Sequence, residues 1–235
     1  AHPEDLGALI EILKSGMITS MSGSQYKLHH DAKCDTLGAL WRILGANHSA
    51  QRVFGEATGF SLLLTMLHSL HREAGNDDTQ PSLMVHMKIF CFLLRVMTAG
   101  VYNNSVNRIS LHSVISSQAF YDLLCESGLL CVDYEKEVIQ LLLELTLEIV
   151  LPPQSVNLQQ AEGVPYEIVE SGSAGYFISS SSFRPEKERV YNAGAIVVLI
   201  RSLLQFTPKV QLDLLNFMEK LAHAGPFNQE NLTSA

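Results

Sequence analysis

The 235-residue chain has few of the features that mark several protein classes, since it contains four cysteines, one tryptophan and only 17% charged residues. Four cysteines in a chain of this length do not form a disulfide scaffold, and their mutual spacing matches no zinc-binding pattern. We therefore expect a reducing compartment. Lysine and arginine number 16 against 24 aspartates and glutamates, for a net charge of −8. This acidic balance disfavours a general nucleic-acid-binding or anionic membrane-binding surface.

Targeting and membrane-spanning signals are also missing. The first residues contain no methionine, no basic segment and no apolar segment of the kind found in signal peptides. The most apolar stretch, residues 138–151, is interrupted by Glu144 and Glu148 and is shorter than the roughly 20 residues that a membrane span needs. The missing methionine, and a chain end that falls within a new helical pattern, favour a fragment of a larger protein.

Hydrophobic residues make up 47% of the chain and recur with helical spacing almost throughout. We expect Asp31, Asn47, Asp133 and Thr207 to cap the starts of helices, because their side chains accept hydrogen bonds from the first free backbone N–H groups. Pro3 and Pro208 suit first helical positions. The apolar spacing predicts helices over residues 5–13, 31–44, 47–57, 60–71, 82–99, 117–128, 134–151, 192–206 and 208–224.

Residues 152–190 differ from the rest, because they are rich in Ser, Gly and Gln and include four consecutive serines at 179–182. Two short apolar runs, 166–169 and 176–178, flank a Gly/Ser segment and favour a small hairpin as one alternative. A long insertion of this kind in a compact domain is usually functional or mobile. Because the helical pattern resumes afterwards, we interpret 152–190 as an inserted flexible loop in one domain covering residues 1–235.

An internal repeat is the most informative feature of the sequence. The segment GALIEIL at 7–13 recurs as GALWRIL at 38–44 and more loosely at 194–200. The second and third copies start 156 residues apart, which is close to the length of four of the roughly 40-residue units of armadillo or HEAT arrays. Residues 47–70 resemble one armadillo unit, with a short capped helix leading through Gly59 into a Leu-rich helix. The predicted fold class is all-α, an armadillo/HEAT-like α-solenoid with one long Ser/Gly-rich inserted loop.

Three segments carry a resemblance to a known family, namely ANHSAQRVFGEATGF at 46–60, NAGAI at 192–196 and TPKVQ at 207–211. They resemble the helical region upstream of the BEACH and WD-repeat modules in the large BEACH-domain proteins. The chain is most similar to the branch of that family with WD repeats and a FYVE domain, over nearly its whole length. The resemblance implies an armadillo-like, cytoplasmic scaffold segment of selective autophagy, which clears protein aggregates, peripheral to autophagic membranes. The FYVE and WD-repeat modules themselves are outside this sequence, so activity is inherited only by analogy.

Motifs for catalysis or metal binding are weak. Residues 24–27 match S-x-x-K, but they lie in a predicted loop without the other elements of that signature. His68 and His71 are three apart on one predicted helix, yet the H-E-x-x-H pattern is missing. His29 and His30 are interpreted as a solvated loop pair, and the cysteines as inert thiols on or beside apolar helix faces. We expect no enzymatic activity, no cofactor and no metal.

A short motif in the predicted loop is the candidate partner-binding site. Its aromatic-x-x-aliphatic core has the acidic neighbours Glu162 and Glu170, as in motifs that bind ubiquitin-like autophagy modifiers by adding a strand to the partner's sheet. The same residues also fit the predicted hairpin. The motif consists of Tyr166, Glu167, Ile168 and Val169.

The second candidate is a concave groove of the helical repeats, where Lys88, Arg95 and Arg108 either face a partner or are simply solvated. Two functions remain open. The first is a non-enzymatic interaction scaffold in selective autophagy, with autophagy modifiers or cargo receptors as protein partners. The second is an armadillo-type regulatory module that binds a small GTPase or another factor of vesicle traffic.

Overall fold

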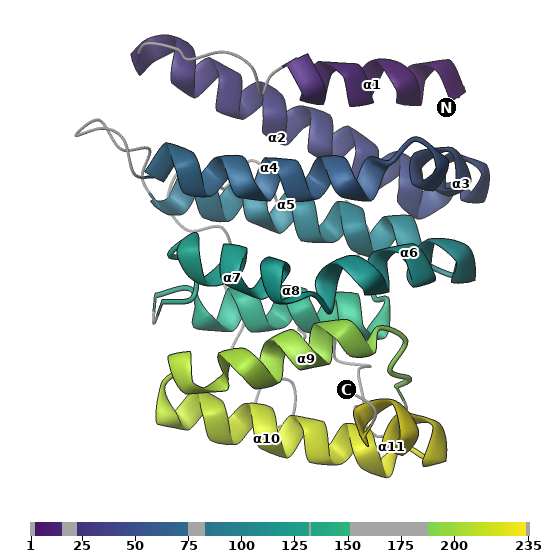
Figure 1. The fold of residues 1–235 in the computed structure, drawn as a ribbon, viewed down its shortest axis with the longest axis vertical. Helices are drawn as coiled ribbons and strands as arrows, with labels where there is room; N and C mark the ends of the chain where they lie inside the picture. The colour runs from purple at the N-terminus through teal and green to yellow at the C-terminus, as the bar shows by residue number, and fades with distance from the viewer. Residues whose placement is uncertain (1–2, 16–22, 75–82, 132, 151–187, 234–235) are drawn as a thin grey trace. The chain divides into compact units, whose positions relative to one another are not determined.

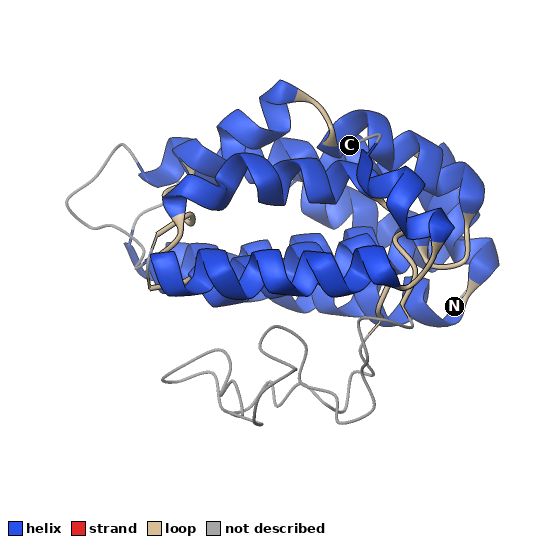
Figure 2. Ribbon diagram, turned by 90° about the horizontal axis from the view of Figure 1, so that it is seen from below, coloured by secondary structure: helices blue, strands red, loops and turns tan. Residues whose placement is uncertain are grey.

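The computed structural model describes residues 3–15, 23–74, 83–131, 133–150 and 188–233. In these ranges every regular secondary-structure element is a helix (Figure 2), which confirms the predicted all-α class for this part of the chain. The predicted inserted loop lies almost entirely outside these ranges. The chain divides into two compact units, residues 1–129 and 130–235, and each is described by itself.

The first unit is built around two long helices. Helix α2 packs against α5 along much of its length, α4 lies against α5 and α7, and the short helix α3 contacts α2, α4 and α5 (Figure 1). Large buried side chains such as Trp41, Phe54 and Phe90 fill the space between them. The helices described in this unit are α1 (Pro3–Ser15), α2 (Gly23–Ala46), α3 (His48–Glu56), α4 (Gly59–Ala74), α5 (Leu83–Val101), α6 (Ser105–Ile115) and α7 (Gln118–Glu126).

The second unit is centred on α8, whose residues from Leu141 to Leu147 are all buried. A helix that is apolar nearly all round needs cover of this kind on most of its sides. Helix α9 packs against α8, and α11 packs against α9 and α10 (Figure 1). The elements described here are α8 (Glu135–Leu147), α9 (Ala193–Ser202), a 3-10 turn (Leu203–Gln205), α10 (Pro208–His223) and α11 (Pro226–Thr233).

The helix–turn–helix from α3 to α4 forms as the sequence predicts. The side chain of Asn47 accepts a hydrogen bond from the Ala50 N–H at 3.1 Å and caps α3. Between the helices, Thr58 adopts a left-handed φ of 60°. A Cβ atom at Gly59 would lie 2.5 Å from the ring of Phe54, so only glycine lets the chain turn this closely over the ring.

Two of the predicted N-caps are wrong. Helix α2 begins at Gly23, so Asp31 is an exposed residue within the helix, and residues 24–27 and His30 are helical rather than in a loop. His30 is buried, which contradicts its interpretation as solvated. Helix α8 begins at Glu135, and the residue in its cap position is Tyr134 rather than Asp133. Apolar periodicity misses the early start of α2 because its first two turns are mostly polar.

The predicted length of the helix at 134–151 is also wrong. Helix α8 ends at Leu147, because Glu148 adopts a left-handed conformation with φ 52° and ψ 41°. The predicted start of α10 at Pro208 is confirmed, and Thr207 occupies its N-cap position. The hydroxyl of Thr207 donates to the Glu135 carboxylate at 2.7 Å, however, instead of capping its own helix. The backbone N–H of Thr207 donates to the same carboxylate, also at 2.7 Å. This pair of bonds joins the starts of α8 and α10.

A recurring contact closes the C-terminal end of four helices, namely α2, α5, α8 and α10. A side-chain amide donates to a carbonyl in the last helical turn, where carbonyls have no donor within the helix. We call these residues the clamp amides. The bonds run from Gln51 to Leu44 (2.9 Å), from Asn107 to Gly100 (2.8 Å), from Asn192 to Leu145 (2.8 Å) and from Asn228 to Leu221 (2.8 Å).

The clamp amides also join neighbouring elements. Gln51 makes a second bond to the Ala99 carbonyl at 3.0 Å, so the C-terminal ends of α2 and α5 meet at one side chain. Asn107 makes a second bond to the Gln51 carbonyl at 2.7 Å. Because their C-terminal ends adjoin and they pack along their lengths, α2 and α5 run parallel.

In the second unit the chain returns to the end of α8. The backbone N–H groups of Tyr191 and Asn192 both donate to the Thr146 carbonyl, at 2.9 and 3.1 Å. Three of the clamp amides lie seven residues after the carbonyl that they bind, whereas Asn192 lies 47 residues after Leu145. The bond from Asn192 to Leu145 therefore spans 40 more residues of sequence than each of the other three clamp bonds.

Candidate functional site

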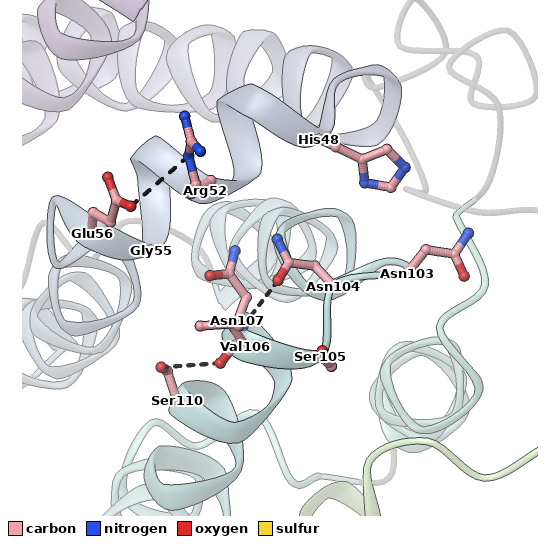
Figure 3. Close-up of a pocket in the computed structure, with 10 residues that line it drawn as sticks. All are labelled: His48, Arg52, Gly55, Glu56, Asn103, Asn104, Ser105, Val106, Asn107 and Ser110. Carbon is pink, nitrogen blue, oxygen red and sulfur yellow. Dashed lines mark hydrogen bonds and ion pairs between the residues drawn. The ribbon is translucent and has the colours of Figure 1, made fainter.

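An open groove of about 750 Å³ lies between α3 and the first turns of α6 in the first unit (Figure 3). Helix α3 forms one wall and the start of α6 forms the other. The groove is lined by His48, Arg52, Gly55, Glu56, Asn103, Asn104, Ser105, Val106, Asn107 and Ser110.

The α3 wall is polar and charged. His48, Arg52 and Glu56 are spaced four residues apart, which places them on one side of the helix. The Nε atom of Arg52 lies 3.9 Å from Oε1 of Glu56, and both side chains are largely exposed. A solvated ion pair of this kind adds little stability. The two charges therefore remain accessible to a partner at little energetic cost.

The α6 wall combines a polar start with an apolar edge. The side chain of Asn104 caps α6 by accepting the Asn107 N–H at 3.1 Å. Val106, the second residue of α6, is 72% exposed, and Ile109, three residues further along the helix, is 74% exposed. Two branched aliphatic side chains three residues apart on one helix form a small apolar surface. The edge of α6 thus offers apolar contact area that nothing in the first unit covers.

The floor of the groove depends on one glycine and one clamp amide. Asn107 is 4% exposed and is held by its bonds to Gln51 and Gly100. A Cβ atom at Gly55 would overlap the amide of Asn107, so glycine permits α3 and α6 to approach this closely. Two helices fixed through a buried amide give the groove a rigid base, with a charged wall and an apolar edge above it. Mixed surfaces of this composition suit contacts with protein segments.

Metal-binding geometry is not found in the described part of the chain, where no three His, Cys, Asp or Glu side chains gather closely enough to hold an ion. His68 is exposed on α4, and the side chain of His71 lies outside the described residues. Within the same ranges, no single helix is long and apolar enough to cross a membrane. The pair α3 and α4, bent by 68°, passes the same length and composition test only when taken together.

The predicted partner-binding motif, Tyr166, Glu167, Ile168 and Val169, lies outside the described residues. The three cations predicted at a groove do not converge on this one. Lys88 and Arg108 are half-buried. Arg95 is 3% exposed and its guanidinium lies 5.5 Å from the centroid of the Trp41 ring, so its interpretation as a solvated charge is wrong. The aromatic face compensates part of the desolvation of the cation.

The burial of two of the four cysteines agrees with the prediction that their thiols are inert. Cys34 and Cys91 are buried, and Cys125 and Cys131 are half-buried. Burial raises the pKa of the Cys34 thiol to about 11, mainly because the thiolate would lose its hydration. The reactive thiolate form is therefore scarce at neutral pH.

Apolar periodicity alone missed α6 and with it the groove. A different signal was present in the sequence, where NHSAQR at 47–52 recurs as NNSVNR at 103–108. The recurring polar residue at the fifth place is the clamp amide, Gln51 in the first copy and Asn107 in the second. An alignment of these two segments predicts a second short helix that begins at about residue 104, one residue before the observed start of α6.

The fold and the groove define an all-helical segment, tied together at its helix ends, with an open surface suited to protein contacts. The chain is 57% identical over 235 residues to Protein SPIRRIG of Arabidopsis thaliana, which covers 99% of this chain and 6% of that protein. It is also 57% identical over 236 residues to BEACH domain-containing protein A2 of Arabidopsis thaliana, covering 100% of this chain and 7% of that protein.

The homologues of this chain are thus BEACH-domain-containing proteins, which confirms the coarser part of the predicted resemblance. The chain spans only 6–7% of the length of these relatives. Similarity to the branch with WD repeats and a FYVE domain stays a prediction. No family model matches the chain, and no solved structure matches it.

Proposed function

We propose that the chain is an armadillo-like protein-interaction segment of a large scaffold protein of the BEACH type, and that the α3–α6 groove binds a segment of a partner protein. The observation that carries the proposal is the groove itself, with a rigid amide-held floor, an accessible ion pair and the exposed Val106 and Ile109. The relatives support the scaffold part, because they are very large proteins that share this segment along its whole length.

The armadillo-like arrangement is supported by the recurrence of one local design. A long helix ends at a clamp amide carried by the next short helix, as at Gln51 in α3 and Asn107 in α6. Repeats of this kind bury their apolar faces by stacking on their neighbours and present extended surfaces to partners. In this proposal the chain binds and spaces other proteins without catalysing a reaction and without a cofactor.

Selective autophagy is the process that we propose for the whole scaffold, in the cytoplasm and close to autophagic membranes. The support is the resemblance of three sequence segments to BEACH-domain proteins of that process. A second recruitment site is proposed at Tyr166–Val169, whose aromatic and aliphatic ends match motifs for ubiquitin-like modifiers.

Binding of purified partners tests both sites. The 235-residue chain is immobilised and presented with ubiquitin-like autophagy modifiers, cargo receptors, and small GTPases loaded with GDP or a GTP analogue. The groove variant is Val106→Asp with Ile109→Asp, which places two charges on the apolar edge. The motif variant is Tyr166→Ala with Val169→Ala. Ile12→Asp is the matched control, because Ile12 is also an exposed aliphatic residue but lies on α1, which does not line the groove.

The expected result is micromolar binding that the groove variant weakens at least tenfold and the Ile12→Asp control leaves unchanged. Loss of binding in the motif variant alone assigns recruitment to Tyr166–Val169 instead of the groove. Binding that depends on the nucleotide of a GTPase supports the regulatory-module alternative. If no modifier or receptor binds, the autophagy assignment is contradicted.

A further inference from the structure

The outer face of α10 carries apolar side chains that the second unit leaves open. Leu215 is 49% exposed, Leu212 is exposed one turn earlier, and Met218 is half-buried one turn later. Residues three apart lie on the same side of a helix. These three residues are called the α10 stacking face below.

The clamp amides give a common register in which the long helices can be compared. Leu215 and Met218 lie six and three residues before Leu221, the carbonyl that Asn228 binds. The same two places before the clamped carbonyl are occupied by Gly38 and Trp41 in α2, Leu94 and Met97 in α5, and Ile139 and Leu142 in α8. All six of these residues are buried. Among these four helices, only α10 has the same places unburied, with Leu215 exposed and Met218 half-buried. Its Leu–x–x–Met pattern is the one found in α5.

In the first unit the structure shows what covers these two places. A Cβ atom at Gly38 would lie 3.4 Å from the ring of Phe92, and Trp41 stacks with Arg95. Phe92 and Arg95 belong to α5, which runs parallel to α2. In α2 these two positions therefore contact the next long helix, α5. Leu215 and Met218 are the equivalent positions in α10.

We propose that the α10 stacking face receives another long helix, parallel to α10 and supplied by the same polypeptide after α11. Helix α11 carries a clamp amide at the end of α10 just as α3 does at the end of α2. In the first unit the chain passes from α3 through α4 to α5 and so returns to the face of α2 (Figure 1). The relatives share this segment within much longer chains, so further polypeptide is available in proteins of this kind. The inference does not depend on the proposed partners.

Cysteine alkylation in two lengths of the protein tests this inference. Leu215→Cys is introduced into the 235-residue chain and into the full-length protein, and the alkylation rate is followed by mass spectrometry of the peptide that contains it. Glu219→Cys is the matched control. Glu219 lies two residues before Leu221, and its counterpart in α2 is Arg42, which stays exposed although α5 packs on α2. Hydrogen exchange of α10 in the two unsubstituted proteins gives a measurement that needs no variant.

We expect Leu215→Cys to react at least ten times more slowly in the full-length protein than in the short chain, with Glu219→Cys reacting at similar rates in both. The backbone of α10 exchanges more slowly in the full-length protein. Equal rates for Leu215→Cys and equal exchange of α10 in the two proteins would overturn the inference. Protection in the short chain that grows with concentration, together with a dimer that Leu215→Asp abolishes, would overturn it in favour of a second copy as the occupant.

Discussion

Replacement of Asn107 by alanine tests whether the clamp amide holds the first unit together. The side chain is buried and donates to the Gln51 carbonyl at 2.7 Å and to the Gly100 carbonyl at 2.8 Å. Alanine removes both donors. Each buried carbonyl that loses its partner costs about 1–3 kcal/mol. We therefore expect the variant to lose roughly 3 kcal/mol of the free energy of unfolding.

Urea unfolding followed by circular dichroism measures this loss. With a slope of about 3 kcal/mol per molar urea, reasonable for a chain of this size, the midpoint falls by about 1 M. Asn104→Ala is the matched control, because it removes a single cap hydrogen bond from the same helix at a cost of about 1 kcal/mol. If Asn107→Ala shifts the midpoint no further than Asn104→Ala, water replaces the amide at little cost and the clamp is not a structural requirement.

Three further predictions concern packing, thiol reactivity and pH. Gly59→Ala should destabilise the first unit by about 1–3 kcal/mol in urea unfolding, since a methyl group there meets the ring of Phe54. In native protein at pH 7.5, mass spectrometry after maleimide treatment should find Cys125 labelled well before Cys34, because burial raises the pKa of the Cys34 thiol to about 11. Burial also raises the pKa of Glu137, so the folded state binds its proton more tightly and loses stability as the pH rises through that pKa. Glu137→Gln should therefore be more stable than the natural chain at pH 7 and lose this advantage near pH 4, as thermal melts at the two pH values can show.

The sequence predicted best those helices whose ends and faces carry independent signals. Helix α3 has the cap Asn47 before it and Gly59 two residues after Ala57, and its bounds agree with the prediction to within one residue. Helix α10 starts at Pro208 and buries Val210, Leu214, Phe217 and Leu221 of the apolar stripe that its spacing predicts, whereas Met218 of that stripe is half-buried. Where capping residues and apolar periodicity indicate the same helix, tertiary packing favours the same bounds.

The failures to predict α6 and the burial of Arg95 and His30 share a physical cause, which is the burial of polar side chains. The buried residues of α6 are Asn107, Leu111 and Ile115, a helical spacing whose first member is an amide and which a hydrophobic pattern does not register. Arg95 and His30 were placed in solvent because of their polarity, yet Arg95 stacks on Trp41 within the core. A pattern of apolar residues cannot foresee that a polar group finds its partner inside the fold.

The α3–α6 groove could not be predicted because α6 was not predicted. The α3–α6 groove requires both helices, and the one not predicted carries Asn107 as its floor and Val106 as its apolar edge. The motif at Tyr166–Val169 could be found from the sequence because it needs only a local pattern. It lies outside the described residues and stays a prediction.

The clamp between Asn192 and Leu145 has a consequence for how this chain can change its length. Its donor and acceptor meet at 2.8 Å although 47 residues separate them, against seven in the other three clamps. In the limit of a fully flexible connection, that lengthening costs only about 2 kcal/mol of closure entropy, since the cost grows with the logarithm of length. The backbone bonds of Tyr191 and Asn192 to Thr146 hold the two ends together whatever lies between them. The end of α8 is thus a position where new sequence can be acquired or lost without shifting the register of the helices on either side.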